Sequence, residues 1–186
     1  MINLYAPGKT GSLRRYLLLL SIAFFLSCGT TREANVLDRS GRPEVIAGVP
    51  EGTSEIREVK YHKTSGEIGH EVLHLRGQLF TKKPSGGGSV QISPCSGCVI
   101  QIATPNDPTI TANVTTHHDG YFEYNGQIVP YTFILNNPGM NPLTIESVEL
   151  DKEGFMTMKI ILAAGTTPER FRITKTGHVY NWTKVQ

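Results

Sequence analysis

The sequence lacks a charge excess and has no acidic residue near its start. Its 186 residues include 18 basic and 16 acidic side chains, which gives a formal net charge of +2. Lys9, Arg14 and Arg15 fall within the first 27 residues, which hold no acid, so the rest carries 15 basic and 16 acidic side chains. A nearly neutral chain without a basic patch gives no electrostatic footprint for nucleic acid, and we expect no such partner.

The sequence also has little that indicates catalysis. Its serine residues are scattered, and no Gly-x-Ser-x-Gly motif occurs. Hydrolases that use a serine nucleophile on a strand-to-helix turn need that motif. We therefore expect a protein that is not an enzyme and that uses no cofactor.

No apolar run reaches the length of a membrane-spanning helix. Residues 16–26 form an apolar run of 11 residues directly after the basic segment, whereas a spanning helix needs about 20. This order is typical of a secretory signal peptide. The run leads into FLSCG at residues 25–29, which resembles a lipobox with its leucine one place late. We expect a signal peptide at 1–27 and lipidation of Cys28. Plain cleavage with an incidental cysteine is the alternative.

A lipidated Cys28 would fix where the protein works. Several acyl chains, at about 0.8 kcal/mol per buried CH₂, make an effectively permanent anchor. Residues 28–55 show no sustained period and few large apolar side chains, which predicts a tether. The folded domain is then expected at 56–186. The expected location is the outer membrane of a bacterial envelope, facing the periplasm or the cell surface.

Alternation of apolar and polar residues dominates the sequence after residue 56. The longest such run places Met156, Met158, Ile160 and Leu162 on one side of an extended segment. Pairs such as Asn125-Gly126 separate the runs, and they suit tight hairpins because they tolerate positive φ. About seven short strands with one buried face each predict an all-β fold. The predicted architecture is an antiparallel β-sandwich.

Four features in this order resemble the carboxypeptidase regulatory-like domain. They are Gly77, PCSGCVI at residues 94–100, THHDGYF at 116–122, and YTFIL at 131–135. The resemblance covers roughly residues 73–164, with a cysteine at position 98 where the family usually has alanine. It implies a sandwich of transthyretin-like or immunoglobulin-like type that is usually a non-catalytic appendage or a surface module. Residues 165–186 fall outside it and are expected to add strands.

We therefore expect a binding or scaffolding lipoprotein, an accessory subunit of an envelope complex with one or more protein partners. A carbohydrate-binding surface protein with a glycan ligand is the alternative. Tyr180 and Trp182 lie on one side of the last segment. Exposed, they could stack on a sugar, and buried, they would be part of the core, which is the more common role of isolated aromatic residues.

His70-Glu71-Val72-Leu73-His74 matches the zinc-protease pattern HExxH. That chemistry needs both histidines one helical turn apart as ligands, with the glutamate activating a zinc-bound water. The third ligand of the longer metzincin motif would fall at Phe80, which cannot bind a metal. Leu75, Gly77 and Leu79 suit a strand, in which His70 and His74 would lie roughly 13 Å apart. We therefore predict a strand over 70–79 and no metal site, and keep a small zinc peptidase as the least favoured alternative.

Cys95 and Cys98 are the pair that remains when Cys28 is lipidated. In an oxidising compartment they are expected to form a structural disulfide. Free thiols, a redox pair, and a zinc site with His117 or His118 are the other interpretations. A redox Cys-x-x-Cys normally opens a helix, and adjacent histidines lack the usual ligand spacing.

Overall fold

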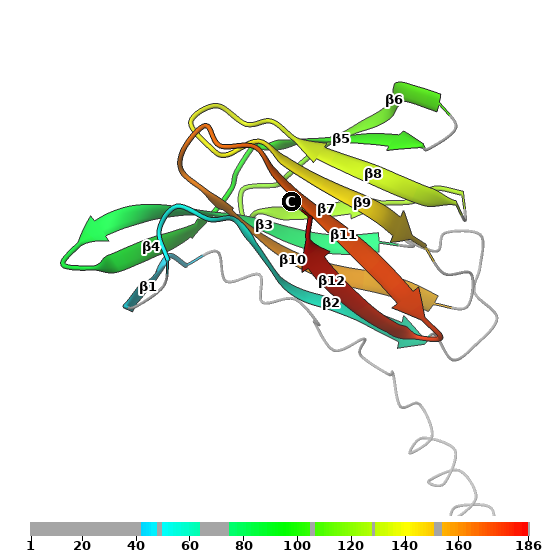
Figure 1. Cartoon of the computed structure of the whole chain (residues 1–186), viewed down its shortest axis with the longest axis horizontal. Coiled ribbons are helices and arrows are strands. Elements are labelled where there is room, and N and C mark those ends of the chain that lie inside the picture. Colours follow the sequence, from blue (N-terminus) through cyan, green and yellow to red (C-terminus); the bar gives the residue numbers. More distant parts are fainter. Residues whose placement is uncertain are drawn as a thin grey trace, which may run out of the picture. The chain divides into compact units, whose positions relative to one another are not determined.

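The computed structural model describes residues 42–47, 50–63, 75–104, 107–127, 129–150 and 154–185. Every regular element in these ranges is a β-strand, so the all-β prediction is confirmed (Figure 1). The strands are β1 (Glu44–Ala47), β2 (Glu55–Lys63), β3 (Leu75–Gly86), β4 (Ser89–Pro94), β5 (Val99–Thr104), β6 (Asp107–Thr115), β7 (Tyr121–Tyr124), β8 (Pro130–Leu135), β9 (Leu143–Glu149), β10 (Gly154–Ala163), β11 (Glu169–Thr176) and β12 (Val179–Lys184).

The strands form two six-stranded sheets that pack as a sandwich (Figure 1). The first sheet has the order β1-β4-β3-β10-β2, with β7 also paired to β3, and the second has the order β12-β11-β9-β8-β5-β6. Two pairings are parallel, β3 with β10 and β9 with β11, whereas the sequence predicted antiparallel pairs. The second pairing follows from the chain path. Because β9, β10 and β11 alternate between the sheets, β9 and β11 run in the same direction.

The main core lies between the sheets and is built by strict alternation. Met156, Met158, Ile160 and Leu162 of β10 all point into it and have no exposed surface. Phe133 and other apolar residues of the second sheet face them. Each large apolar side chain buried in this way contributes about 1.5–3 kcal/mol of hydrophobic stabilisation. The predicted inner face of this segment is confirmed.

A close contact with a neighbouring strand explains why residue 77 is a glycine. It pairs with Phe122 of β7, and a Cβ atom built on Gly77 would overlap the Phe122 ring. Only glycine leaves room for that ring in the core. Gly120 has φ of +74°, and a Cβ there would meet the carbonyl oxygen of Leu79. These contacts fix β7 and its entry turn against β3.

The outer part of the first sheet has a second, smaller core. Phe80, Val90 and Ile92 are buried together with Ile161 of β10, and Ile46 packs against them. These residues lie on the face of the sheet opposite to the main core, because they occupy the alternate positions of their strands. Residues 80–86 of β3 with β4 and β1 therefore form a three-stranded extension of the sheet, which we name the arm (Figure 1).

The structure differs from the sequence interpretation at the start of the domain. β1 and the first residue of β2 lie inside the segment 28–55, for which the sequence predicts a tether. Of the strand predicted over 70–79, residues 75–79 belong to β3, with Leu75 and Leu79 buried as expected. Gln78, whose side chain points to the opposite face of the strand, is also buried at 1 % exposure. One-sided burial therefore does not hold for the centre of this sheet.

Candidate functional site

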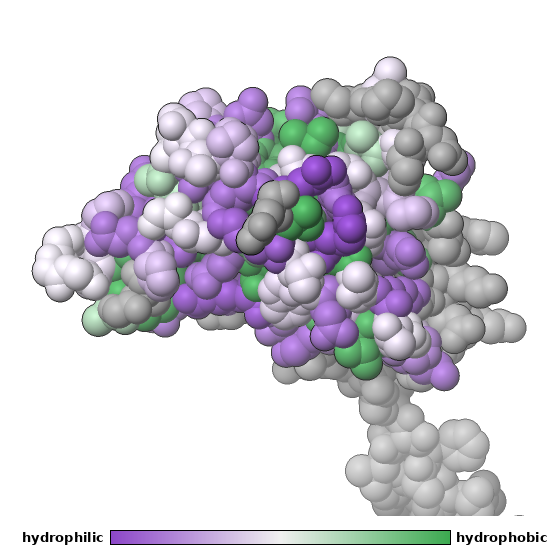
Figure 2. All heavy atoms as spheres, in the orientation of Figure 1, coloured by the Kyte–Doolittle hydropathy of each residue, from purple (hydrophilic) through white to green (hydrophobic). Residues whose placement is uncertain are grey.

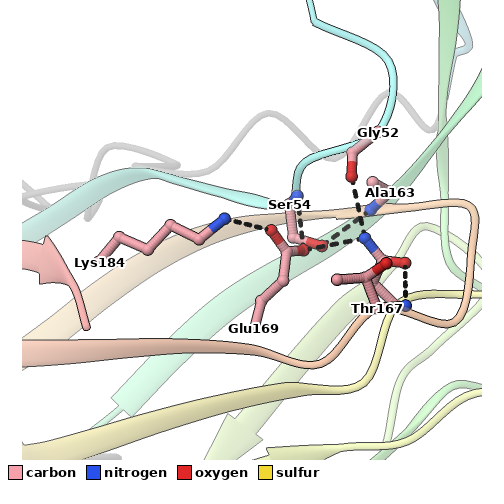
Figure 3. A network of polar contacts seen from close by, with 7 residues as sticks. Gly52, Ser54, Ala163, Thr167, Glu169 and Lys184 are labelled. Atoms are coloured by element: carbon pink, nitrogen blue, oxygen red, sulfur yellow. Dashed lines mark hydrogen bonds and ion pairs between the residues drawn. The ribbon is translucent and has the colours of Figure 1, made fainter. Parts of the chain in front are cut away.

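A buried polar cluster surrounds the carboxylate of Glu169, at the start of β11 (Figure 3). Its Oε2 accepts hydrogen bonds from the Ser54 backbone N–H at 2.8 Å and from Asn141 Nδ2 at 3.2 Å. Its Oε1 accepts from Lys184 Nζ of β12 at 2.8 Å. We name Glu169, Ser54, Asn141 and Lys184 the carboxylate clasp. It joins segments far apart in the sequence.

Two bonds extend the clasp to neighbouring backbone. The Ser54 hydroxyl oxygen accepts from the Ala163 N–H at 3.0 Å, and Asn141 Nδ2 also donates to the carbonyl of Gly52 at 3.0 Å (Figure 3). Buried polar groups are costly unless they are hydrogen-bonded. Sequence reasoning missed this cluster, because its four members share no motif.

The charge state of Glu169 follows from two opposing effects. Burial raises the pKa of its carboxyl, and the hydrogen bonds from Lys184, Ser54 and Asn141 lower it by more, so the pKa lies below its ordinary value. The side chain of Glu169 is only 2 % exposed, and Ser54 is 1 % exposed. Because no substrate can reach either group without unfolding the site, the clasp suits cross-linking of the fold and not catalysis.

The predicted cysteine pair lies at the entry to β5. The structure joins the two sulfur atoms, with the Cα atoms of Cys95 and Cys98 5.7 Å apart and both residues buried. Thr116, directly after β6, fixes the same turn: its hydroxyl donates to the Cys95 carbonyl and accepts from the Cys98 N–H. The pair therefore sits in a structural turn, with Gly97 at φ of +69° between them.

The turn that carries His117, His118 and Asp119 is held by its own backbone. Asp119 is buried, and its Oδ1 accepts from the Tyr121 N–H at 3.1 Å, which is the turn role expected for an aspartate. Both histidines are exposed. In the described ranges no group of three or more His, Cys, Asp or Glu residues could hold a metal ion.

Several predicted site residues lie outside the described residues. Cys28 belongs to this group, as do His70, Glu71 and His74 of the HExxH string. The described part of β3 begins at Leu75, directly after His74. Lipidation and the absence of zinc chemistry therefore stay predictions from the sequence.

The two aromatic candidates of the last strand differ in their exposure. Tyr180 is buried at 5 % exposure, and its hydroxyl donates to the Glu149 carbonyl at 3.2 Å. Trp182 is partly buried and packs against the main core. Tyr180 is therefore removed as a candidate for glycan stacking, because a buried ring offers no free face to a sugar.

The outer face of the first sheet holds an aromatic and cationic row that the sequence did not reveal. The rings of His62 and Phe155 stack at 4.8 Å, and the guanidinium of Arg76 lies 4.6 Å from the Phe155 ring centre. His62 Nε2 is 2.9 Å from Thr157 Oγ1. Burial, followed by the charge of Lys60, lowers the pKa of His62. The row covers a central part of the sheet that would otherwise expose Phe155.

The arm has two different faces. One face carries the polar side chains of Thr81, Lys83, Gln91 and Ser93, which line a cavity of about 210 Å³. The residues of the smaller core occupy its other face. On β1, at the margin of the arm, Val45 is 62 % exposed. The arm is thus a rigid extension of the sheet, with polar side chains on one face and an exposed apolar residue on its outermost strand.

The surface over β11 and β12 differs from the arm in the described part of the chain. Figure 2 shows the face over β11 and β12 as mainly hydrophilic, with the hydrophobic groups among its described residues small and separate. On β11, Arg170 and Arg172 both pair with Glu146 of β9. Such exposed pairs stabilise a surface only slightly.

None of the described residues belongs to a helix with the length and hydrophobicity needed to cross a membrane. No protein-family model matches the chain, and no curated protein matches it with significant similarity. The resemblance to carboxypeptidase regulatory-like domains therefore rests on the sequence features described above.

Proposed function

We propose that this chain is a non-catalytic binding or scaffolding lipoprotein, anchored through Cys28 and acting as an accessory subunit of a bacterial outer-membrane complex. The signal-like segment and the lipobox-like sequence before Cys28 support the anchor. The arm is the single observation that carries the binding role.

The arm suits docking for a physical reason. Its strands have a small core of their own, with Val90 fully buried and Ile92 3 % exposed. A surface that is already rigid loses little conformational entropy when a partner binds. The polar face of the arm, which includes Lys83 and Gln91, supplies hydrogen-bonding groups, and Val45 supplies apolar surface area. This mixture is typical of a non-obligate protein interface.

The buried polar groups of the domain support the same assignment. The clasp around Glu169 and the turn at Asp119 are hydrogen-bonded within the fold. Asn137 likewise uses its amide to bind both backbone groups of Val99, at 2.9 and 3.3 Å. These residues fix loops at the ends of strands, so binding surfaces are held in place by the scaffold.

The anchor is tested by Cys28→Ala. We expect the wild-type chain to fractionate with membranes and the variant to appear as a soluble or uncleaved form. Acyl chains are the anchor in this proposal, so metabolic labelling with an alkyne fatty acid should mark the wild type alone. Membrane retention of Cys28→Ala at the mature size would rule the anchor out.

The binding role is tested by photo-cross-linking of the full chain in its envelope. A photoreactive residue at Val45 or Gln91 on the arm should capture a defined protein partner. The same residue at Thr174, which is exposed on β11, serves as the matched control and should capture none. Equal capture from all three positions, or from Thr174 alone, would remove the arm as the docking surface.

A further inference from the structure

Strand β6 ends the second sheet, and among the described strands it pairs only with β5. The hydrogen bonds of Thr116 show which backbone groups face outward. Its N–H donates to the Cys98 carbonyl at 2.9 Å, and its carbonyl accepts from the Gly97 N–H at 3.1 Å, so both groups face β5. In an antiparallel ladder this direction alternates along the strand. Val114 therefore also faces β5, while the N–H and C=O groups of Asn113 and Thr115 face the open edge.

The last four residues of this edge lack the usual protection against strand pairing. Residues 112–115 read ANVT and contain no charged residue and no proline, whereas the start of β6 carries Asp107 and Pro108 and pairs irregularly with β5 before Ala112. Natural sheet edges are normally blunted by lysine, proline or bulges. At the other end of the same sheet, β12 carries Lys184 and lies beside β2, where the rings of Tyr61 and His178 stack at 4.4 Å. The lysine and this contact protect that end, whereas no described strand pairs with the outer edge of residues 112–115.

The side chains of β6 are complementary to a second copy of themselves. Ala112 and Val114 are half-buried and pack against the main core, while Asn113 and Thr115 are exposed. A two-fold axis at Asn113 would place Asn113 opposite its copy and Val114 opposite Ala112. Both apolar residues would then be covered by their counterparts, and the core would continue from one copy to the next. The outward N–H and C=O groups of Asn113 would find partners in the second copy.

We propose that two copies of this chain pair antiparallel through the open edge of β6, about a two-fold axis at Asn113. The nearly equal numbers of acidic and basic residues after Cys28 leave little net repulsion between the copies. The dimer deepens the scaffolding role proposed above and rests on it in one respect: anchoring in a shared membrane raises the effective concentration of the copies.

The test is register-specific cysteine cross-linking of the full chain in membranes. In a hydrogen-bonded antiparallel pair, opposite Cα atoms are about 5.5 Å apart, which a disulfide can span. Asn113→Cys should therefore give a reducible dimer of twice the monomer mass. Thr115→Cys is the matched control, because the two copies of residue 115 would lie four positions apart, roughly 13 Å along the strands. It should stay monomeric.

A second variant separates pairing from folding. Because the N–H of Asn113 faces away from β5, Asn113→Pro removes no hydrogen bond of the sheet. We expect Asn113→Pro to keep the wild-type melting temperature and to lose the dimer, measured by light scattering of the purified lipoprotein in detergent. Retention of the dimer in a folded Asn113→Pro protein would overturn the proposal.

The remaining outcomes are equally decisive. Equal cross-linking at residues 113 and 115 would indicate random collision, and no cross-linking at either would exclude the dimer. Capture of a different protein by Asn113→Cys would replace the second copy with another partner. Each of these results leaves the membrane anchor standing, because the fractionation of Cys28→Ala tests that separately.

Discussion

Replacing the buried carboxylate of the clasp should destabilise the domain measurably. In Glu169→Gln, the amide oxygen can still accept the bonds from Ser54 N and Asn141 Nδ2, but it no longer carries charge. Hydrogen bonds to charged groups contribute about 1.5–3 kcal/mol, against about 0.5–1.5 kcal/mol for neutral ones, so these two bonds together lose roughly 2 kcal/mol. The amide nitrogen would face the ammonium of Lys184. Since the Lys184 side chain is 50 % exposed, it can turn away, and losing its pair adds about 0–1 kcal/mol.

The expected total is therefore about 2–3 kcal/mol of unfolding free energy, or about 5–10 °C in melting temperature for a domain of this size. The pH dependence gives a second, independent signature. The pKa of Glu169 is lower in the folded protein than its ordinary value. Its contribution is thus complete above the unfolded pKa of about 4.3 and is lost as the pH falls through the folded value. The gap between wild type and Glu169→Gln should be full at neutral pH and shrink in acid.

Thermal unfolding followed by circular dichroism at several pH values measures both effects. Glu149→Gln, which changes an exposed carboxylate on the same sheet, is the matched control and should leave the melting temperature nearly unchanged. A Glu169→Gln protein as stable as wild type at neutral pH would refute the reasoning. So would a stability gap that stays constant between neutral pH and about pH 3, well below the ordinary glutamate pKa.

Three further predictions follow from the core, the cysteines and the HExxH string. Gly77→Ala should cost about 1–3 kcal/mol by overpacking against Phe122, whereas Gly52→Ala, where the added Cβ meets nothing within 4 Å, should change the chemical-denaturation midpoint little. Cys95 and Cys98 should resist alkylation without reductant in intact-mass measurements, and replacing both with serine should cost only about 2 kcal/mol because the closed loop is short; two alkylated thiols in the native protein would contradict the disulfide. Glu71→Gln should leave every measured activity unchanged, whereas Leu75→Asp should cost about 3–5 kcal/mol by burying an unpaired charge. Stoichiometric zinc lost on replacing His70 and His74 would show the first half of this last prediction to be wrong.

Alternation in the sequence was sufficient to predict the all-β class and the inner face of β10. It did not reveal β2, and the structure shows why. Ile160 pairs with Ile56, but Lys159 pairs with Glu58, so a bulge inserts one residue and breaks the period of two. Val59 then follows Ile56 by three positions, so the buried residues of this strand do not alternate regularly in the sequence.

The polar features were hidden for a different reason. The Ser54–Glu169 bond spans 115 residues, and the Asn141–Glu169 bond spans 28. A contact of this kind depends on the sheet order, which local periodicity does not determine. Gln78 and Lys82 of β3 are polar yet buried, so a rule that assigns polar residues to a solvated face fails in the middle of a covered sheet.

The pairing of β2 with β10 has a consequence for how the chain acquires its fold. β2 is complete by residue 63, yet its only partner among the described strands starts at Gly154. During synthesis or export from the N-terminus, β2 must wait for about ninety residues before it can pair. Loop closure over such distances slows folding and exposes unpaired strands. A chain that ends before β10 would lack the strand joining β2 to β3, so we expect such truncated chains to be degraded or to aggregate instead of folding in part.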